Sequence, residues 1–308
     1  MTSGLPASVA DWSLAETDGE RIVGCRRTPM GGGTVAARIE RIDIDLATAD
    51  DRPCTIAVVQ KWTWRHEVLG LRAAQAARPA ASAVPRLLAD GTDGNGHWLI
   101  TPFYEGTVVA RALVPGEVFE SLARLHVAYA QAWTDLAGIP VVDAEWWRGI
   151  CLSFALGAVN RQAAHHPSPT LERARSVLER MADDERVGQV LARLPRSLLH
   201  GDVHTGNIVV GDTGSTLVDW GSARIGPPML DLANVTSLDE PGFAAYATAW
   251  HQSTGGRLDP GLVQLGYRWA AVQIPIQYLA WLVEHRSPAE VDGALDRAER
   301  ALALLRAS

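Results

Sequence analysis

Two short polar segments, both close to apolar runs, constrain this chain more than any other feature. The first is HGDVHTGN at residues 200–207, and the second is DWG at residues 219–221. Apolar residues precede and follow the first segment, which predicts a loop between two buried stretches. Within it, four residues separate Asp202 from Asn207, and Asp219 follows twelve positions after Asn207. The chain has only four asparagines, so this clustering of His, Asp and Asn indicates a site rather than chance.

The order and spacing of these three residues match the catalytic loop of phosphoryl-transfer enzymes of the kinase type. In that arrangement Asp202 accepts the proton of an acceptor hydroxyl, while Asn207 and Asp219 bind a divalent cation. Mg²⁺ or Mn²⁺ suits the second role because hard cations prefer carbonyl and carboxylate oxygens. The transferred group is strongly anionic, so the chemistry needs positioning and positive charge more than covalent catalysis.

A single lysine, Lys61, supplies a second and independent signal. The other 27 of the 28 basic residues are arginines. A bias that replaces ordinary surface lysines with arginine should have replaced this one too, unless a compact ammonium is required there. We therefore predict that Lys61 contacts the α- and β-phosphates of a nucleotide. The alternative is one leftover surface lysine.

Two nearby features complete a nucleotide site. Glu67 lies six residues after Lys61 at the start of a predicted helix, where it can pair with the lysine. Gly31, Gly32 and Gly33 form a run whose backbone can lie over phosphates. By themselves, a glutamate on a helix is often solvated and a glycine run is often an ordinary turn.

The order of predicted elements indicates an α+β fold with two lobes. Residues 1–102 read as antiparallel strands plus one helix, and residues 103–308 as a larger, mostly helical lobe with a connector near 102–106. In the first lobe, apolar Ile42, Ile44 and Leu46 alternate with acidic residues, as in a half-buried strand. The predicted strands are 21–26, 42–46, 55–62, 84–91 and 97–103, with a helix at 65–77.

The second lobe shows helical spacing. Val118, Leu122, Leu125 and Tyr129 mark one helix face. Further helices are predicted at 146–164, 170–192 and 260–285, with Pro275 interrupting the last, and a final helix opens with the capping box at 287–290 and runs to about residue 306.

With these motifs, the chain resembles the superfamily of aminoglycoside phosphotransferases and choline kinases, which has a protein-kinase-like fold. The likeness covers roughly residues 20–235. It implies a gatekeeper role for Thr101, and contact of the Pro102 carbonyl and the Tyr104 N–H with the nucleotide base. The motifs that carry it, in order, are the glycine run, VVQK with the helix glutamate, VPRLL, WLITPFYEG, LARLH, HGDVHTGN and VDWG.

Two positions depart from the family pattern. Pro102 stands where many relatives have a residue with a free N–H, although only its carbonyl is needed. Pro227 and Pro228 replace the usual Asp-Pro before Asp231. Asp231 is a candidate acceptor ligand, with a helix cap or loop anchor as the alternative.

The acceptor is less constrained than the chemistry. Residues 231–308 hold nine acidic residues and six arginines, too balanced for a site that collects polycations alone. Trp269 and Trp281 are candidates for a platform under a ring or sugar face, although most aromatic residues in this stretch are expected in the core. We expect antibiotic inactivation or self-resistance, with an aminoglycoside, nucleoside-type or other antibiotic as acceptor. The alternatives are a sugar, choline or amino-alcohol kinase, or a kinase-like binding protein without activity.

Composition excludes several other classes. The formal net charge is −7 and no Lys/Arg block occurs, which argues against nucleic acid as a partner. Neither a secretory signal nor an apolar run long enough to span a bilayer is visible, so we expect a cytoplasmic protein. Three scattered cysteines predict thiols rather than disulfides. His200, Asp202 and His204 also form an HxDxH pattern that could hold zinc or iron, but the downstream Asn and DWG favour the kinase interpretation.

Overall fold

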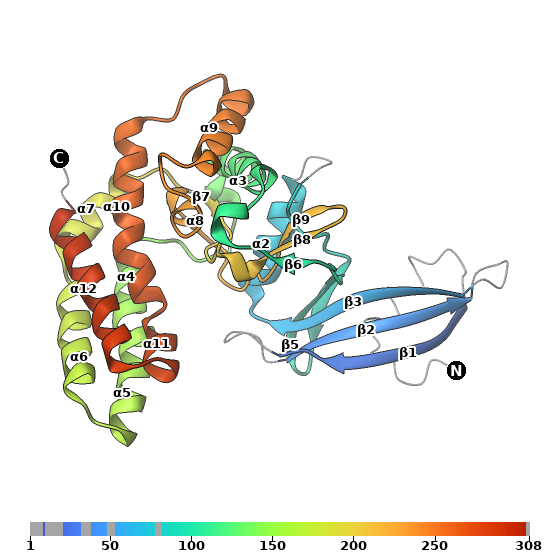
Figure 1. Ribbon diagram of the computed structural model, residues 1–308, viewed down its shortest axis with the longest axis horizontal. Coiled ribbons are helices and arrows are strands. Elements are labelled where there is room, and N and C mark those ends of the chain that lie inside the picture. Colours follow the sequence, from blue (N-terminus) through green and yellow to red (C-terminus); the bar gives the residue numbers. More distant parts are fainter. Residues whose placement is uncertain (1–8, 10–20, 32–37, 48–52, 78–81, 306–308) are drawn as a thin grey trace. The chain divides into compact units, whose positions relative to one another are not determined.

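The computed structural model describes residues 9, 21–31, 38–47, 53–77 and 82–305 (Figure 1). The chain divides into two compact units. The first comprises Met1–Ser121, Leu136–Ile139 and His200–Ala223, and the second comprises Leu122–Asp135, Pro140–Leu199 and Arg224–Ser308. This grouping differs from the expected boundary after residue 102, because the segment with the polar motifs groups with the N-terminal strands. The division into a nucleotide-binding and an acceptor-binding lobe stays a prediction.

An antiparallel five-stranded sheet dominates the first unit, with strand order β1-β2-β3-β5-β4. Along β2 the predicted alternation is present, since Ile42, Ile44 and Leu46 are all buried. These side chains pack with Val58 and Ile100 into a small core. The strands are β1 (Arg21–Pro29), β2 (Arg38–Ala47), β3 (Pro53–Thr63), β4 (Ala89–Asp93) and β5 (Gly96–Pro102), and helix α2 (Arg65–Ala76) follows β3.

A second, three-stranded sheet includes the hairpin that lies between the two polar motifs in the chain. It has the order β6-β8-β9, formed by β6 (Thr107–Val108), β8 (Ile208–Gly211) and β9 (Gly214–Leu217). A short 3₁₀ helix, Thr205–Asn207, leads directly into β8. Helix α3 (Gly116–Tyr129) begins in this unit, after a 3₁₀ turn at Arg111–Leu113.

The second unit is mostly helical, and its core centres on an edge-to-face pair of buried tryptophans. Trp147 and Trp269 have ring centroids 5.2 Å apart. Leu178, Val272 and Leu295 belong to the same core cluster. The elements are α4 (Ala144–Gly149), a π-helical turn (Ile150–Ala155), α5 (Leu156–His165), α6 (Pro169–Ala182), α7 (Glu185–Arg193), α8 (Met229–Ala233), α9 (Pro241–Thr254), α10 (Pro260–Gln277), α11 (Leu279–His285) and α12 (Pro288–Leu304), with a 3₁₀ turn at Trp133–Asp135.

Strands β7 (Ser197–Leu199) and β10 (Arg224–Gly226) pair antiparallel in the second unit. Leu199 is the partner of Arg224 in this register. Residues 200–223 are therefore a connecting segment whose two ends are held together by this strand pairing. Both polar motifs lie in that connecting segment.

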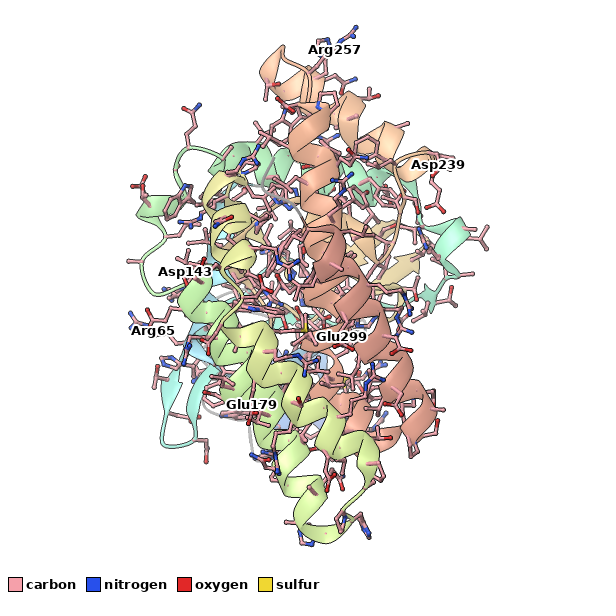
Figure 2. The ribbon with its side chains drawn as sticks, turned by 90° about the vertical axis from the view of Figure 1, so that its left-hand side faces the viewer. Arg65, Asp143, Glu179, Asp239, Arg257 and Glu299 are labelled. Carbon is pink, nitrogen blue, oxygen red and sulfur yellow. The ribbon has the colours of Figure 1, made fainter. Side chains whose placement is uncertain are left out.

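Ion pairs join α6 to α12 in the second unit, and Glu299, one of the residues involved, is labelled in Figure 2. Arg173 contacts the carboxylates of Asp292 at 3.0 Å, Asp296 at 2.5 Å and Glu299 at 2.8 Å. Arg180 contacts the other oxygen of Glu299 at 2.7 Å.

Several predicted boundaries need correction. Strand β4 begins at Ala89, so most of the predicted strand 84–91 lies before it. The predicted helix 170–192 is two helices, because Asp184 accepts a hydrogen bond from the Arg186 N–H and caps α7. Pro275 lies inside α10, and the chain leaves that helix only at Tyr278. The capping box at Ser287 and Glu290 is present as predicted.

Candidate active site

Lys61 lies near the end of β3 with its ammonium group between two carboxylates. Its Nζ donates to Glu67 Oε1 at 2.7 Å and to Asp219 Oδ1 at 2.6 Å. Lys61 is 6% exposed and Glu67 is 2% exposed. The structure thus brings together a strand, the helix that follows it, and the DWG segment. The lone lysine is no leftover surface residue.

Electrostatics keeps Lys61 and Asp219 charged. Burial lowers the pKa of Lys61, but Glu67 and Asp219 outweigh that effect and the net pKa lies above its ordinary value. Burial likewise raises the pKa of Asp219, whereas the charge and hydrogen bond of Lys61 bring it below its ordinary value. A buried ammonium flanked by carboxylates is held as a fixed positive charge.

Thr63 also positions Glu67, a role that the sequence pattern alone did not indicate. Its hydroxyl donates to Glu67 Oε2, so the two oxygens of the carboxylate have separate partners, Thr63 and Lys61. The only signal in the sequence was the i, i+4 spacing of Thr63 and Glu67 across the start of α2.

Loop 200–207 is organised by His200. The Asp202 N–H donates to His200 Nδ1 at 3.3 Å, and the other ring nitrogen, Nε2, lies 2.9 Å from the Val218 carbonyl. A carbonyl can only accept, so the ring carries its proton on Nε2. His200 is fully buried and stacks edge-on against Trp220. It is therefore a structural residue that ties the loop to the strand before Asp219.

The β8–β9 hairpin sets Asn207 near Asp219. Ile208 pairs with Leu217 at the open end of the hairpin, and the Val218 N–H donates to the Asn207 carbonyl at 2.9 Å. Asn207 thus precedes the first strand and Asp219 follows the second, at the same end. This is the physical reason for their spacing in the sequence.

The donor set suits a hard cation. The Asn207 side-chain Nδ2 donates to the Asp202 carbonyl at 2.9 Å, which turns the amide oxygen away from that bond and leaves it available as a ligand. The Asp219 carboxylate is ionised and its side chain is 39% exposed. One amide oxygen and one carboxylate fit Mg²⁺ or Mn²⁺, which retain waters and take few protein ligands.

The transition-metal alternative has no support in the described part of the chain. Within it, no group of three or more His, Cys, Asp or Glu side chains is arranged to hold a metal. His204 Nε2 is 3.8 Å from Asp202 Oδ2, and both ring nitrogens of His200 face backbone groups.

The residues expected around the nucleotide base lie on and after β5. Thr101 pairs with Val59 and Pro102 with Val58 of β3, and both are half-buried. The Tyr104 hydroxyl accepts from the Arg86 N–H at 2.7 Å. Gly31 is exposed and follows β1, and no atom of the described residues lies within 4 Å of a Cβ built on it, whereas Gly32 and Gly33 lie outside the described residues.

Two of the three residues expected near an acceptor are inaccessible. Asp231 and Trp269 are both 0% exposed. Asp231 Oδ2 lies 3.3 Å from His126 Nε2, and His126 Nδ1 lies 3.0 Å from the Tyr246 hydroxyl, which together form a buried polar cluster. The burial contradicts an acceptor role for these two residues and favours the anchor alternative for Asp231. Trp281 is 36% exposed, with His285 stacked at 5.2 Å and Arg286 at 4.8 Å.

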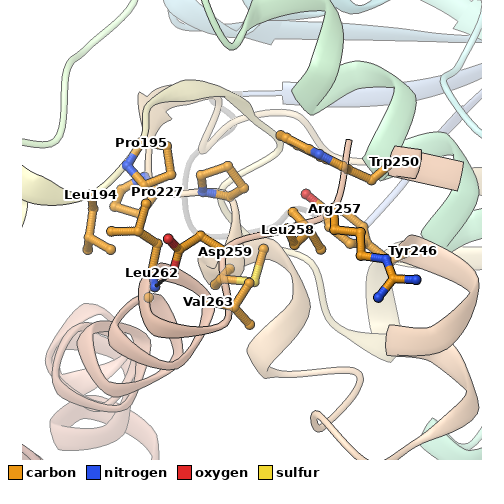
Figure 3. Close-up of a pocket in the computed structure, with 13 residues that line it drawn as sticks. Leu194, Pro195, Pro227, Tyr246, Trp250, Arg257, Leu258, Asp259, Leu262 and Val263 are labelled. Carbon is orange, nitrogen blue, oxygen red and sulfur yellow. Dashed lines mark hydrogen bonds between the residues drawn. The ribbon is translucent and has the colours of Figure 1, made fainter. Parts of the chain in front are cut away.

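The second unit has a cavity of about 160 Å³ that the sequence analysis did not anticipate (Figure 3). Trp250 and Arg257 lie on one side of it and Leu194 and Pro195 on the other. The lining is mainly apolar and includes Pro227 and Pro228, the positions noted above as departures from the family pattern. None of the three expected acceptor residues lines this cavity.

Comparison with known proteins decides the family. Residues 65–266, more than half of the chain, match the phosphotransferase enzyme family. The chain belongs to this family. The match covers Glu67, Asp202, Asn207 and Asp219. It begins after Lys61, so the proposed role of this lysine rests on its being the single lysine of the chain and on its contacts in the structure. The superfamily of aminoglycoside phosphotransferases and choline kinases, inferred from the motifs, is confirmed.

Solved structures confirm the protein-kinase-like α+β fold of this phosphotransferase. Choline kinase from Cryptosporidium parvum is similar with a TM-score of 0.58 and 10% identity, over 91% of this chain and 90% of that one. The GDP complex of an aminoglycoside 2′-phosphotransferase-IIIa mutant has a TM-score of 0.51 and 14% identity, over 96% and 97%. A choline/ethanolamine kinase family protein from Mesorhizobium loti has a TM-score of 0.50 and 14% identity, over 95% and 94%.

No curated protein matches the phosphotransferase chain. Among the residues that the structure describes, no helix has the length and apolar character needed to cross a membrane.

Proposed function

We propose that this phosphotransferase transfers the γ-phosphate of ATP or GTP to a hydroxyl group of a small molecule, with Mg²⁺ or Mn²⁺ as cofactor. The observation that carries the proposal is the position of Lys61, whose buried ammonium contacts Glu67 and Asp219 at 2.7 and 2.6 Å. Glu67 and Asp219 offset the cost of burying this charge, but a buried ion pair adds little stability over apolar residues of similar volume, so its retention favours a functional role. An anionic nucleotide in contact with the lysine explains its retention.

Each residue has a defined task in the proposed reaction. The acceptor oxygen forms a bond to the γ-phosphorus as the bond from phosphorus to the nucleoside diphosphate breaks, and the acceptor proton passes to Asp202. The loop around His200 holds the Asp202 backbone in place for this transfer. Lys61, kept in position by Glu67, binds the nucleotide phosphates. A cation held by Asn207 and Asp219 would offset the phosphate charge when bound.

The nucleotide is proposed to lie along β1, β3 and β5. Gly31, with its neighbours Gly32 and Gly33, would cover the phosphates. Thr101 would border the base, which the Pro102 carbonyl and the Tyr104 N–H would contact. With a nucleoside triphosphate as donor, we place the reaction in the cytoplasm.

For the acceptor we propose an antibiotic, either inactivated or kept harmless to its producer, of the aminoglycoside, nucleoside-type or another class. Trp281 remains the one candidate of the three with an exposed surface. A metabolic sugar, choline or amino-alcohol kinase is the second candidate, since solved structures similar in fold include a choline kinase. A silent binding protein is disfavoured because Lys61, Asp202, Asn207 and Asp219 are all present and Lys61 contacts Asp219.

The test is a phosphate-transfer assay with γ-labelled ATP and GTP against a panel of antibiotics and small alcohols. We expect label in one acceptor class and no transfer in excess EDTA. Transfer to an antibiotic but not to sugars or choline would support the first acceptor class, and the reverse would support the second. Full transfer in excess EDTA would overturn the proposed cation-dependent reaction.

A further inference from the structure

His66, which no part of the proposed reaction uses, joins α2 to the DWG segment. Its Nε2 lies 2.9 Å from the Gly221 carbonyl oxygen. A carbonyl only accepts hydrogen bonds, so His66 carries its proton on Nε2 and donates it. The two residues are 155 positions apart in the sequence, so the bond is a tertiary contact inside the first unit.

Both partners lie beside residues of the site. His66 immediately precedes Glu67 on α2, and Gly221 is the second residue after Asp219. Gly221 also donates a backbone hydrogen bond that lowers the pKa of Asp219, after the larger effects of burial and Lys61. One glycine therefore accepts from His66 through its carbonyl and donates to the metal-binding carboxylate through its N–H.

The helix and the segment also touch directly. A Cβ atom added at Gly70 would lie 2.4 Å from the Cβ of Ala223, a distance that real side chains do not allow. Ala223 is 1% exposed. The backbone of α2 therefore lies against the segment 219–223 one helical turn beyond the His66 bond.

This attachment lies next to Asp219, whose backbone conformation is strained. Asp219 is the one non-glycine residue of the described chain with a positive φ, at 63°. Aspartate tolerates that region better than most residues, but it still costs free energy, and neighbouring contacts must hold it. Before Asp219, Val218 is held by Asn207 and His200. After it, the His66 bond to Gly221 is the matching contact.

We propose that His66 is a positioning residue that holds the DWG segment against α2, so that Asp219, Lys61 and Glu67 keep one arrangement. It acts through Gly221 and does not touch the nucleotide. The structural part of this proposal stands without the proposed function, whereas its effect on kinetics rests on it.

Hydrogen–deuterium exchange of the nucleotide-free protein tests the structural part. The variants are His66→Ala, which removes the donor, and His66→Gln, whose amide restores a donor at similar reach. His165→Ala, the same change at an exposed histidine of the second unit, is the matched control. We expect roughly twofold to tenfold faster exchange in residues 219–223 for His66→Ala, the range set by one hydrogen bond, and near-normal exchange for His66→Gln. Unchanged exchange in His66→Ala, or equal increases in both His66 variants, would overturn the proposal.

Steady-state kinetics with the acceptor found in the panel tests the consequence. His66→Ala should raise the nucleotide KM and the Mg²⁺ concentration needed for half-maximal rate, each by roughly twofold to tenfold. His66→Gln should restore both values. The assays are run well below the melting temperature of each variant, so that unfolding does not contribute. A lower melting temperature with unchanged KM would show a role in stability only and contradict the positioning role. If the wild-type protein transfers no phosphate at all, the proposed function fails, while the exchange result still decides the role of His66.

Discussion

At the scale of single residues, the site is a set of charged and polar side chains, several of which have defined partners. Lys61 contacts Glu67 and Asp219, Glu67 contacts Thr63 as well, and Asn207 is oriented by the Asp202 carbonyl. Each contact restricts a side chain that would otherwise sample several rotamers. Substitutions that preserve charge but change shape are therefore the most informative.

Lys61→Arg should lose most of its kcat/KM although the charge is kept. The ammonium occupies a buried space between two carboxylates, and a planar guanidinium has a different size and fork geometry. Steady-state kinetics against nucleotide measures the loss, with melting curves to confirm folding. The matched control is the exposed Arg65, labelled in Figure 2, where Arg65→Lys should leave kinetics unchanged. Retention of most of the wild-type kcat/KM in Lys61→Arg would show that the compact ammonium is not needed.

Asp202→Asn should lower kcat by about a hundredfold to ten-thousandfold, the range for loss of a general base, while nucleotide binding persists. The amide keeps the shape of the carboxylate and cannot accept the proton. Asp212→Asn, the same change at an exposed residue of the first unit, should leave kcat unchanged. A wild-type kcat in Asp202→Asn would remove this residue from the proposed mechanism.

At the scale of elements, α2 matters because it carries Glu67 and lies against the segment after Asp219. Gly70 permits this close approach, since Ala223 leaves no space for a Cβ. The helix and the segment therefore depend on each other for their position.

Gly70→Ala should destabilise the protein by about 1–3 kcal/mol, the usual cost of overpacking. Ala223→Gly removes the opposing methyl group, so the double variant should recover part of the loss. The measurement is a double-mutant cycle of unfolding free energies. Strictly additive effects would show that the two positions do not compete for the same space.

The ion pairs between α6 and α12 predict that the melting temperature depends on salt concentration. Arg173 bonds three carboxylates, and these contacts raise its pKa further above its ordinary value. Arg173→Gln should lower the melting temperature at low ionic strength, and the difference should shrink in high salt because salt screens exposed charges. Arg175→Gln, on the same helix, is the control because Arg175 bonds the neutral amide of Asn160. A melting difference that does not change with salt would point to packing by the arginine stem instead.

At the scale of the whole molecule, a bound nucleotide should report on its stability. A ligand that binds only the folded state stabilises it by about 2.7 kcal/mol at a hundred times its Kd. We expect a melting-temperature rise with ADP and Mg²⁺ that largely disappears when EDTA replaces the metal. Differential scanning calorimetry measures both conditions. An equal rise in EDTA would mean that Asn207 and Asp219 do not bind a cation needed by the nucleotide.

The amino-acid sequence by itself predicted the class of the fold, which the structure confirms, and it supplied the residues of the proposed site. Asn207 and Asp219 could be proposed as partners from the sequence because they flank one short hairpin, and Asp202 lies in the loop just before it, so their distances along the chain limit their distances in space. Lys61 and Glu67 span a strand end and the following helix, which is likewise a local arrangement. Periodicity similarly predicted the alternation along β2.

Only the tertiary structure decided burial and contacts between distant segments. Asp231 and Trp269 looked like candidate acceptor residues, yet both are enclosed by elements far away in the sequence, His126 of α3 and Trp147 of α4. The bond from His66 to Gly221 and the close approach of Gly70 to Ala223 also join segments more than a hundred residues apart. Spacing along a chain limits geometry only over short loops, whereas these contacts depend on how whole elements pack.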